Sequence, residues 1–130
     1  MTGEYLADAC ALIVFPAYEQ PDRLMPNAAT LMREAEILVS PITVWEITRK
    51  VSIGKLPPVW MDGQTFSQLL HAQGFRLHPL SWDEAEASNA LPSLHRDPMD
   101  RMLIATALRN GLTIITDDRQ CAAYGVRTVW

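Results

Sequence analysis

The chain has 130 residues and a mass of 14.6 kDa, which fits one compact domain with a core of its own. Its composition, 48% hydrophobic and 20% charged, excludes a disordered tail, a collagen-like fibre and a disulfide mini-protein. Eleven basic and fifteen acidic residues give a net charge of -4, the wrong sign for non-specific binding to nucleic acid, so a phosphate-bearing partner would need a bound cation, a partner chain or a local basic patch.

Apolar segments and helix-capping patterns alternate along the chain and predict strands that alternate with helices. The expected strands run from Tyr5 to Asp8 and over residues 37–39, 75–77, 112–116 and 126–129. The expected helices cover residues 9–15, 27–36, 42–51, 62–73, 81–89 and 98–109, and a short helix begins at residues 117–118. Their N-cap candidates are Asn27, Ser40, Asp62, Ser81 and Asp97. This alternation implies right-handed crossovers and a parallel sheet with helices on both faces.

Neither an internal repeat nor a long linker divides the sequence, so we expect a single domain over residues 1–130. The two cysteines, Cys10 and Cys121, form no CxxC pattern, which is typical of the reducing cytosol. The longest apolar run, residues 9–15, is far shorter than a membrane span. We therefore expect a cytoplasmic protein with no membrane contact.

Acidic residues follow two of the predicted strands, Asp8 after the first and Asp117-Asp118 after the fourth. Glu46 and Asp100 lie near the starts of helices that can face the same edge of the sheet. Ligands of parallel α/β sheets bind beyond the carboxyl ends of the strands. We therefore expect these acids to converge there.

A cluster of this kind needs protons or a cation, because two carboxylates about 4 Å apart repel by roughly 4 kcal/mol at an effective dielectric of 20. Hard oxygen ligands select Mg²⁺ or Mn²⁺. The chemistry that suits such a site is metal-assisted hydrolysis of a phosphodiester.

Each acid also has a structural interpretation. Asp97 precedes a proline as a helix N-cap, and Asp100 in the first turn favours the helix dipole. One acid of the 117–118 pair is expected to be a cap as well, and Glu46 could belong to the polar stripe of an amphipathic helix. Asp8 is a cap or a ligand, because an acid between a buried strand and an apolar helix needs compensation.

Five segments, in order and covering nearly the whole chain, closely resemble PIN-domain nucleases of the VapC toxin type. They are Tyr5-Leu-Ala-Asp8-Ala-Cys-Ala-Leu, Ser40-Pro-Ile-Thr-Val-Trp-Glu46-Ile, Lys50-Val-Ser-Ile-Gly-Lys-Leu56, His95-Arg-Asp-Pro-Met-Asp100-Arg-Met-Leu-Ile-Ala-Thr-Ala107, and Thr116-Asp-Asp118 with Tyr124-Gly-Val126. The resemblance implies a Rossmann-like PIN domain, a central parallel sheet flanked by helices on both faces, with an acidic pocket that binds Mg²⁺ or Mn²⁺ and cleaves RNA. It also implies a VapB-like antitoxin and a homodimer.

Carried over by motif, the catalytic and metal-binding acids of the family fall on Asp8, Glu46, Asp100 and Asp118. We expect Asp8 and Asp100 to hold the principal metal, while the other two complete its shell or orient water. Thr116 is expected to support the site by hydrogen bonding, and Asp97 matches an extra acid of one subgroup. Asp117 stays an alternative to its neighbour, because one residue of slippage would exchange them. Many family members carry Ser or Thr where this chain has Ala9, so that hydroxyl is missing.

Basic residues near these motifs are candidates for RNA phosphate contacts, with solvated surface charge as the alternative. They are Arg49, Lys50, Lys55, Arg96 and Arg101. A metal-activated water requires no imidazole base, so His95 is given no catalytic role, although it is the histidine nearest the site. Trp60 is a candidate partner contact.

Two other functions stay open: a PIN fold that binds an antitoxin or RNA without cutting, and a DNA-directed nuclease. A haloacid phosphatase is excluded, because it requires Asp-x-Asp-x-Thr where this chain reads Asp8-Ala-Cys-Ala-Leu. An antitoxin is expected to place an amphipathic helix in an apolar groove, with a basic residue reaching the acidic pocket.

Overall fold

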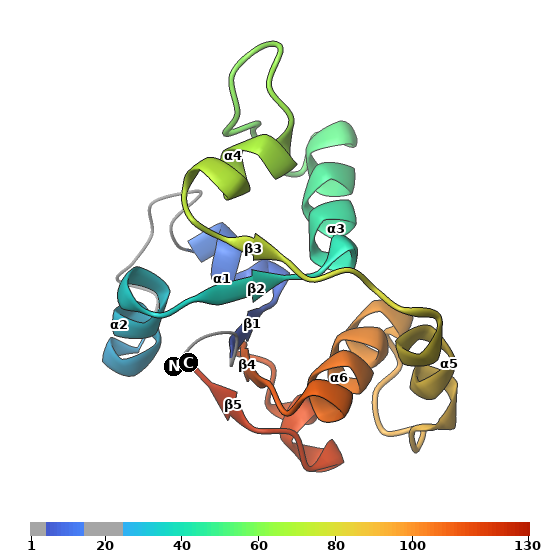
Figure 1. Cartoon of the computed structure of the whole chain (residues 1–130). Coiled ribbons are helices and arrows are strands. Elements are labelled where there is room, and N and C mark those ends of the chain that lie inside the picture. Colours follow the sequence, from blue (N-terminus) through green and yellow to red (C-terminus); the bar gives the residue numbers. More distant parts are fainter. Residues whose placement is uncertain (1–4, 15–24) are drawn as a thin grey trace.

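The computed structural model describes residues 5–14 and 25–130, and a parallel sheet lies at the centre of this part of the chain (Figure 1). Its strands are β1 (Tyr5–Ala7), β2 (Ile37–Val39), β3 (Arg76–Leu77), β4 (Thr113–Ile115) and β5 (Thr128–Val129). They are ordered β3-β2-β1-β4-β5, and every neighbouring pair is parallel. The predicted parallel α/β sheet is confirmed.

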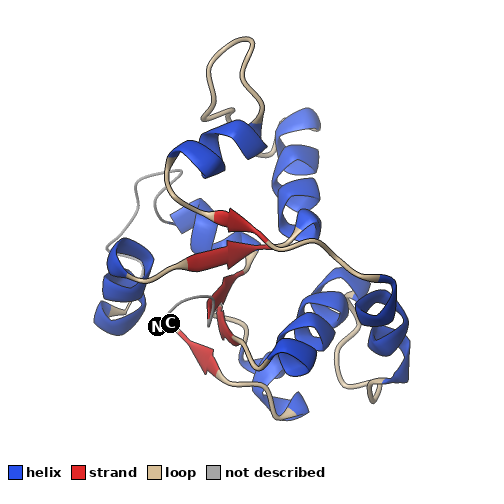
Figure 2. Cartoon of the chain, in the orientation of Figure 1, coloured by secondary structure: helices blue, strands red, loops and turns tan. Residues whose placement is uncertain are grey.

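Helices lie on both sides of this sheet (Figure 2). They are α1 (Ala9–Val14), α2 (Pro26–Glu34), α3 (Pro41–Ser52), α4 (Phe66–Ala72), α5 (Trp82–Ala90), α6 (Pro98–Asn110) and the 3-10 helix η2 (Arg119–Tyr124). No helix in the described part of the chain is both long and apolar enough to cross a bilayer.

The inner strands β1, β2 and β4 bury both of their faces, because successive side chains point to opposite sides of a sheet, whereas the edge strands β3 and β5 are more exposed. Ala7 and Ile115 belong to a core that includes residues of α1, α2, α3 and α4. Their strand neighbours Leu6 and Ile114 belong to a second core, formed mainly with α6. The short, apolar strands are thus explained by burial, and they bring Asp8 and Thr116 to the same edge of the sheet.

Several helix boundaries follow the predicted capping residues. Ser40 accepts a hydrogen bond from the amide of Ile42, and Ser81 accepts one from the amide of Glu84. Gly111 adopts φ 64°, a left-handed conformation that favours glycine, and ends α6.

Two predicted helix starts are wrong. The second helix begins at Pro26 with Met25 as N-cap, so Asn27 lies inside it; proline has the φ that a first helical position needs. The fourth begins at Phe66, because Thr65 and Gln68 form a reciprocal capping box that satisfies two amides, which Asp62 does not do. Phe15 and most of the expected loop over residues 16–26 lie outside the described residues.

Candidate functional site

Asp8 lies where β1 passes into α1. Its amide donates to the carbonyl oxygen of Ile115 at 3.2 Å, and its Oδ1 accepts from the amide of Ala11 at 3.0 Å. One carboxylate oxygen therefore caps α1, while the residue as a whole is only 8% exposed. An acid so deeply buried needs compensation for its charge.

The surroundings of Asp8 make its ionisation unfavourable. Burial raises its pKa to about 7, although hydrogen bonds from the Thr116 side chain and the Ala11 amide act in the opposite direction. The charges of Asp117 and Asp100 raise it further. A positive charge beside this carboxyl group would therefore stabilise its ionised form.

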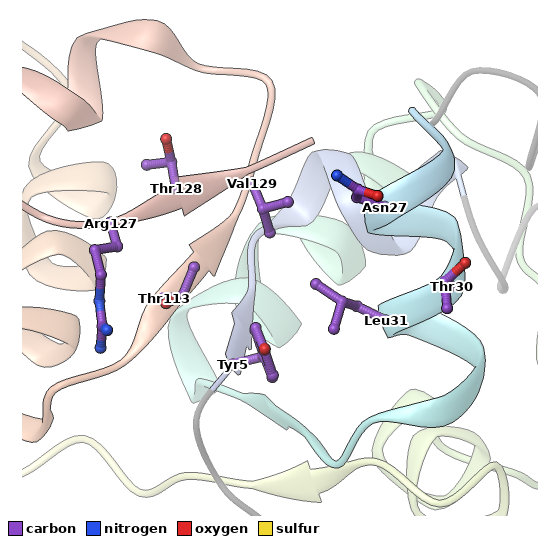
Figure 3. A pocket seen from close by; sticks show the side chains of 8 residues that line it. All are labelled: Tyr5, Asn27, Thr30, Leu31, Thr113, Arg127, Thr128 and Val129. Carbon is purple, nitrogen blue, oxygen red and sulfur yellow. The ribbon is translucent and has the colours of Figure 1, made fainter. Parts of the chain in front are cut away.

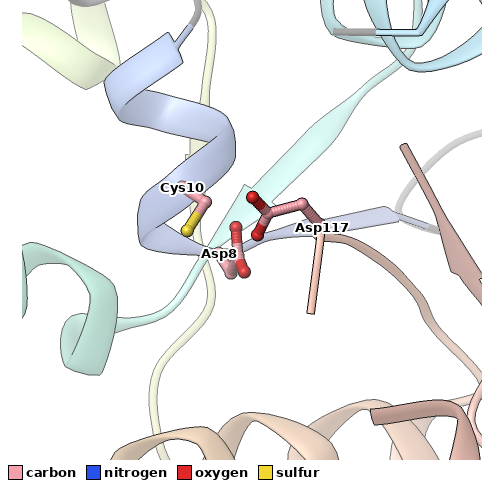
Figure 4. A group of neighbouring side chains, drawn as sticks. All are labelled: Asp8, Cys10 and Asp117. Carbon is pink, nitrogen blue, oxygen red and sulfur yellow. The ribbon is translucent and has the colours of Figure 1, made fainter. Parts of the chain in front are cut away.

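Asp8, Cys10 and Asp117 come together on one side of the site (Figure 4), with ligand atoms within 4.8 Å of one another. Burial, followed by the charges of Asp8 and Asp117, raises the pKa of the Cys10 thiol well above its usual value. The thiol is therefore protonated at neutral pH, and the available ligands on this side are carboxylate oxygens. The sequence analysis does not place Cys10 in this cluster, although its position two residues after Asp8 is a signal for it.

Asp100, in the first turn of α6, is the centre of the other side. A carboxylate oxygen of Asp100 lies within 4.8 Å of carboxylate oxygens of Glu46 and Asp97, which form one group with it. In a second group it lies within 4.8 Å of a ring nitrogen of His95 and a carboxylate oxygen of Asp118. Burial and the charge of Asp97 raise the pKa of Asp100 to about 6, against the lowering effect of His95.

Glu46 projects from α3 toward the same acids. Burial raises its pKa, and so does the charge of Asp97, while Lys50 one turn later lowers it. The raised pKa values of separate carboxyl groups have a common physical cause, since several acids share one partly buried region.

We call this region the acidic site: Asp8, Glu46, Asp97, Asp100, Asp117 and Asp118. The described residues contain three tight groups of possible ligands, and no group contains both Asp8 and Asp100, which are coupled through their charges. Thr116 joins the two sides, because its hydroxyl accepts from the amide of Asp118 at 3.0 Å and its side chain also bonds to Asp8.

The doublet at residues 117–118 contributes to both sides. Asp117 lies beside Asp8, whereas Asp118 lies beside Asp100. Asp118 also caps η2, because its Oδ1 accepts from the amide of Gln120 at 2.9 Å. Both residues of the doublet therefore lie in the acidic site, at two neighbouring positions.

His95 contacts two acids of the acidic site, although the sequence predicted no catalytic role for it. Its Nε2 lies 2.6 Å from Oδ2 of Asp118 and 3.2 Å from Oδ2 of Asp100. Its position before Arg96 and Asp97 in the motif was a signal for this placement, but spacing alone did not show which acids it contacts.

The basic residues proposed to contact RNA have different surroundings. Lys50 is close enough to affect the pKa of both Glu46 and Cys10, and Arg49, Lys55 and Arg96 are exposed. The guanidinium of Arg101 is occupied within the fold.

Arg101 donates to the carbonyl oxygens of Ser88, Leu91 and Pro92 at 2.8–3.0 Å. Its NH1 also lies 3.3 Å from the Tyr124 hydroxyl. Arg101 therefore has a structural role, because its donors bind the end of α5 and the loop that follows.

Residues of the described strands help to line two sizeable cavities. The larger, about 630 Å³, is bounded by β1, β4, β5 and α2, and its lining side chains include Tyr5, Leu31 and Val129 (Figure 3). None of its lining residues belongs to the acidic site. The second, about 490 Å³, is lined by Thr116, Asp117 and Asp118, and gives a ligand access beside the acids.

The donor set fits a hard divalent cation. Carboxylate oxygens come from four separate parts of the chain. Burial and, after it, neighbouring acids raise the pKa values of Asp8 and Asp100, so a cation would favour their ionised forms. Oxygen donors of this type suit Mg²⁺ or Mn²⁺.

Comparison with known proteins gives a family and a set of similar folds. A comparison with curated proteins found no significant match. Among solved structures, VapBC2 from Rickettsia felis bound to a DNA fragment from its promoter aligns with a TM-score of 0.71 and 17% identity, over 97% of this chain and 98% of that chain. FitAB bound to an IR36 DNA fragment aligns with a TM-score of 0.64 and 20% identity, over 95% and 92% of the two chains.

FitAcB from Neisseria gonorrhoeae is similar to the same degree, with a TM-score of 0.63 and 20% identity over 97% of this chain and 96% of that chain. At these identities the likeness concerns the fold. The sequence of residues 5–126 matches the PIN domain family over nearly the whole chain. The chain therefore belongs to the PIN domain family.

Proposed function

We propose that this PIN domain is a metal-dependent endoribonuclease and the toxin of a toxin-antitoxin pair. The observation that carries the proposal is the acidic site at the carboxyl edge of the sheet, where a buried Asp8 with a pKa of about 7 lies beside acids from other segments. Folding keeps these charges together at a cost in stability, which is expected where a function requires them.

Asp8 and Asp100 would hold the Mg²⁺ or Mn²⁺ ion, and Glu46 and Asp118 would complete its shell or orient water. A divalent ion bound there supplies Lewis acidity that lowers the pKa of water and stabilises charge on the phosphodiester. Asp97, Asp117 and Thr116 would support these acids through charge and hydrogen bonds.

Substrate binding requires positive charge, because RNA must approach a protein with a net charge of -4. Lys50 is near the acids, and exposed Arg49, Lys55 and Arg96 would contact phosphates farther along the strand. The bound cation would supply the rest of the charge.

The partner would be a VapB-like antitoxin. The similar VapBC2 and FitAB structures are complexes with DNA fragments, and their fold extends over nearly all of this chain. The antitoxin would lay an amphipathic helix in an apolar groove and direct a basic residue into the acidic site. The toxin would act as a homodimer in the cytoplasm.

The test is cleavage of a total-RNA pool by purified protein with Mg²⁺ or Mn²⁺. The wild type is compared with Asp8→Asn, which keeps an acceptor for the Ala11 amide but removes the charge. Asp62→Asn, which changes an exposed acid outside the acidic site, is the matched control.

We expect discrete fragments from the wild type and the control, none after chelation, and at least a 100-fold slower reaction for Asp8→Asn, the order of effect of losing a principal charged group. A parallel reaction with single-stranded DNA tests the DNA-directed alternative. Metal binding without cleavage of either polymer would contradict the proposal and favour a non-catalytic binding module.

A further inference from the structure

The loop between α5 and α6 brings His95 into contact with two acids of the acidic site, although the proposed chemistry requires no imidazole. The Nε2 atom lies 2.6 Å from Oδ2 of Asp118 and 3.2 Å from Oδ2 of Asp100. The His95 side chain is 11% exposed, so solvent competes little for these contacts.

The other ring nitrogen identifies the tautomer. The backbone amide of Asp97 donates to Nδ1 of His95 at 3.1 Å, so Nδ1 must be an acceptor without a proton. In the neutral ring the proton then belongs to Nε2, which donates it toward Asp118 and Asp100. For Nε2 to bind a metal, the proton would have to move to Nδ1, where the Asp97 amide already donates, so this hydrogen bond favours a donor role for Nε2 over a ligand role.

The backbone around His95 is fixed by groups from α6 and η2. The amides of Leu94 and His95 donate to the Tyr124 hydroxyl at 3.1 and 2.7 Å, and that hydroxyl donates to the carbonyl oxygen of Pro92 at 2.8 Å. Arg101 donates to the same carbonyl oxygen at 2.8 Å. The ring is therefore held in place before any ligand binds.

We infer that His95 is a positioning residue of the proposed nuclease site, a fixed Nε2–H donor that holds Asp118 and Asp100 side by side. This inference rests on the proposed function. Two carboxylates whose oxygens lie within 4.8 Å repel when both are ionised, and a shared donor between their Oδ2 atoms offsets part of that repulsion. The two acids are thus kept in place for a cation, and loss of such outer hydrogen bonds typically weakens metal binding about 10- to 100-fold.

The first test measures the tautomer in the metal-free wild type. Long-range ¹H–¹⁵N correlation at pH 8 distinguishes protonated from unprotonated ring nitrogens, and the signals of His95 are assigned by their loss in His95→Gln. We expect the proton on Nε2. A proton on Nδ1 would overturn the inference whatever the protein does to RNA.

The second test measures Mn²⁺ affinity by titration for the wild type, His95→Gln and His95→Ala, with His71→Ala as the control at an exposed histidine. The glutamine side chain can place an amide N–H near the position of Nε2–H, whereas alanine removes the donor. We expect about 10- to 100-fold weaker binding for His95→Ala, substantial retention for His95→Gln, and no change for the control.

Unchanged affinity in His95→Ala, equal losses in both His95 variants, or a spin-echo signal from an imidazole nitrogen bound directly to Mn²⁺ would each overturn the inference. If wild-type protein binds Mn²⁺ and cuts RNA in these cases, only the role of His95 fails. A wild type that binds no Mn²⁺ overturns the proposed function together with it. Should His95→Ala fail to fold, the tautomer and the His95→Gln affinity still decide the question.

Discussion

Replacing Asp8 by asparagine is expected to make the metal-free protein more stable while it removes activity. The pKa of Asp8 is raised from 3.8 to about 7, chiefly by burial. At about 1.4 kcal/mol per pKa unit, ionised Asp8 lowers the free energy of unfolding by about 4 kcal/mol above pH 7. Asparagine carries no charge and keeps an acceptor for the Ala11 amide, so this value is the upper limit of the gain.

The stability of the wild type should depend on pH because Asp8 titrates at a different pH in the folded and unfolded states. Because the folded pKa lies above the unfolded value, the folded protein keeps a proton that the unfolded chain releases between pH 3.8 and about 7. The free energy of unfolding of the wild type therefore falls as pH rises through this window. The asparagine side chain does not titrate, so the advantage of the Asp8→Asn variant should grow by up to about 3 kcal/mol between pH 5 and pH 8.

The assay is urea unfolding followed by tryptophan fluorescence in the presence of a chelator, with Asp62→Asn as the control at an exposed position. Saturating Mn²⁺ should stabilise the wild type, by about 2.7 kcal/mol at 100 times its dissociation constant, and the variant much less. A variant that is less stable than the wild type by the same amount at both pH values would refute the reasoning, because Asp8 would then act only through shape and hydrogen bonds.

Three further changes test other parts of the structure. Burial opposes ionisation of Glu84, but hydrogen bonds from His78, Thr106 and Asn110 lower its pKa. The Glu84→Gln variant should therefore lose about 1–3 kcal/mol of unfolding free energy in urea at pH 7, and this loss should shrink as pH falls below 4.5. A loss that does not depend on pH would contradict this. The buried hydroxyl of Thr43 has no hydrogen-bond partner among the described residues, so Thr43→Val should raise the free energy of unfolding by about 1 kcal/mol in thermal unfolding. A lower stability of the variant would show that the hydroxyl does have a hydrogen-bond partner. Arg101→Lys keeps the charge but not the forked donors, so it should cost about 1–2 kcal/mol and speed hydrogen exchange at residues 92–97, whereas unchanged exchange would reject the structural role.

The sheet and the place of the acids could be predicted because they depend on local patterns. A short apolar strand followed at once by Asp8 specifies both a buried element and an acid at its carboxyl end. The Asn110-Gly111 pair ended α6 for a similarly local reason. By contrast, Asn27 and Asp62 are cap candidates by residue type alone, and the stronger starting signals nearby, Pro26 and the Thr65 capping box, determine where the helices begin.

Contacts between separate segments of the chain explain the surroundings of Arg101 and His95, which the sequence did not predict. Arg101 lies within a site motif in the sequence, yet its donors bind carbonyl oxygens at the end of α5 and in the following loop, nine to thirteen residues earlier. The contact of His95 with Asp118 spans 23 residues, and no periodicity or spacing encodes that distance. Sequence patterns located the charged groups, whereas their hydrogen-bond partners depended on how α5, α6 and η2 pack.

The cap and ligand interpretations of these acids do not exclude each other, because a carboxylate has two oxygens. Asp8, Asp97 and Asp118 each use Oδ1 to accept from a backbone amide at the start of a helix. Each keeps a second oxygen, which in Asp118 accepts from His95. The caps orient the carboxylates, so helix starts and the acidic site depend on the same residues. Asparagine at these positions keeps the cap and removes the charge, whereas alanine removes both, so comparing the two substitutions separates the stability supplied by each cap from the stability lost to each charge.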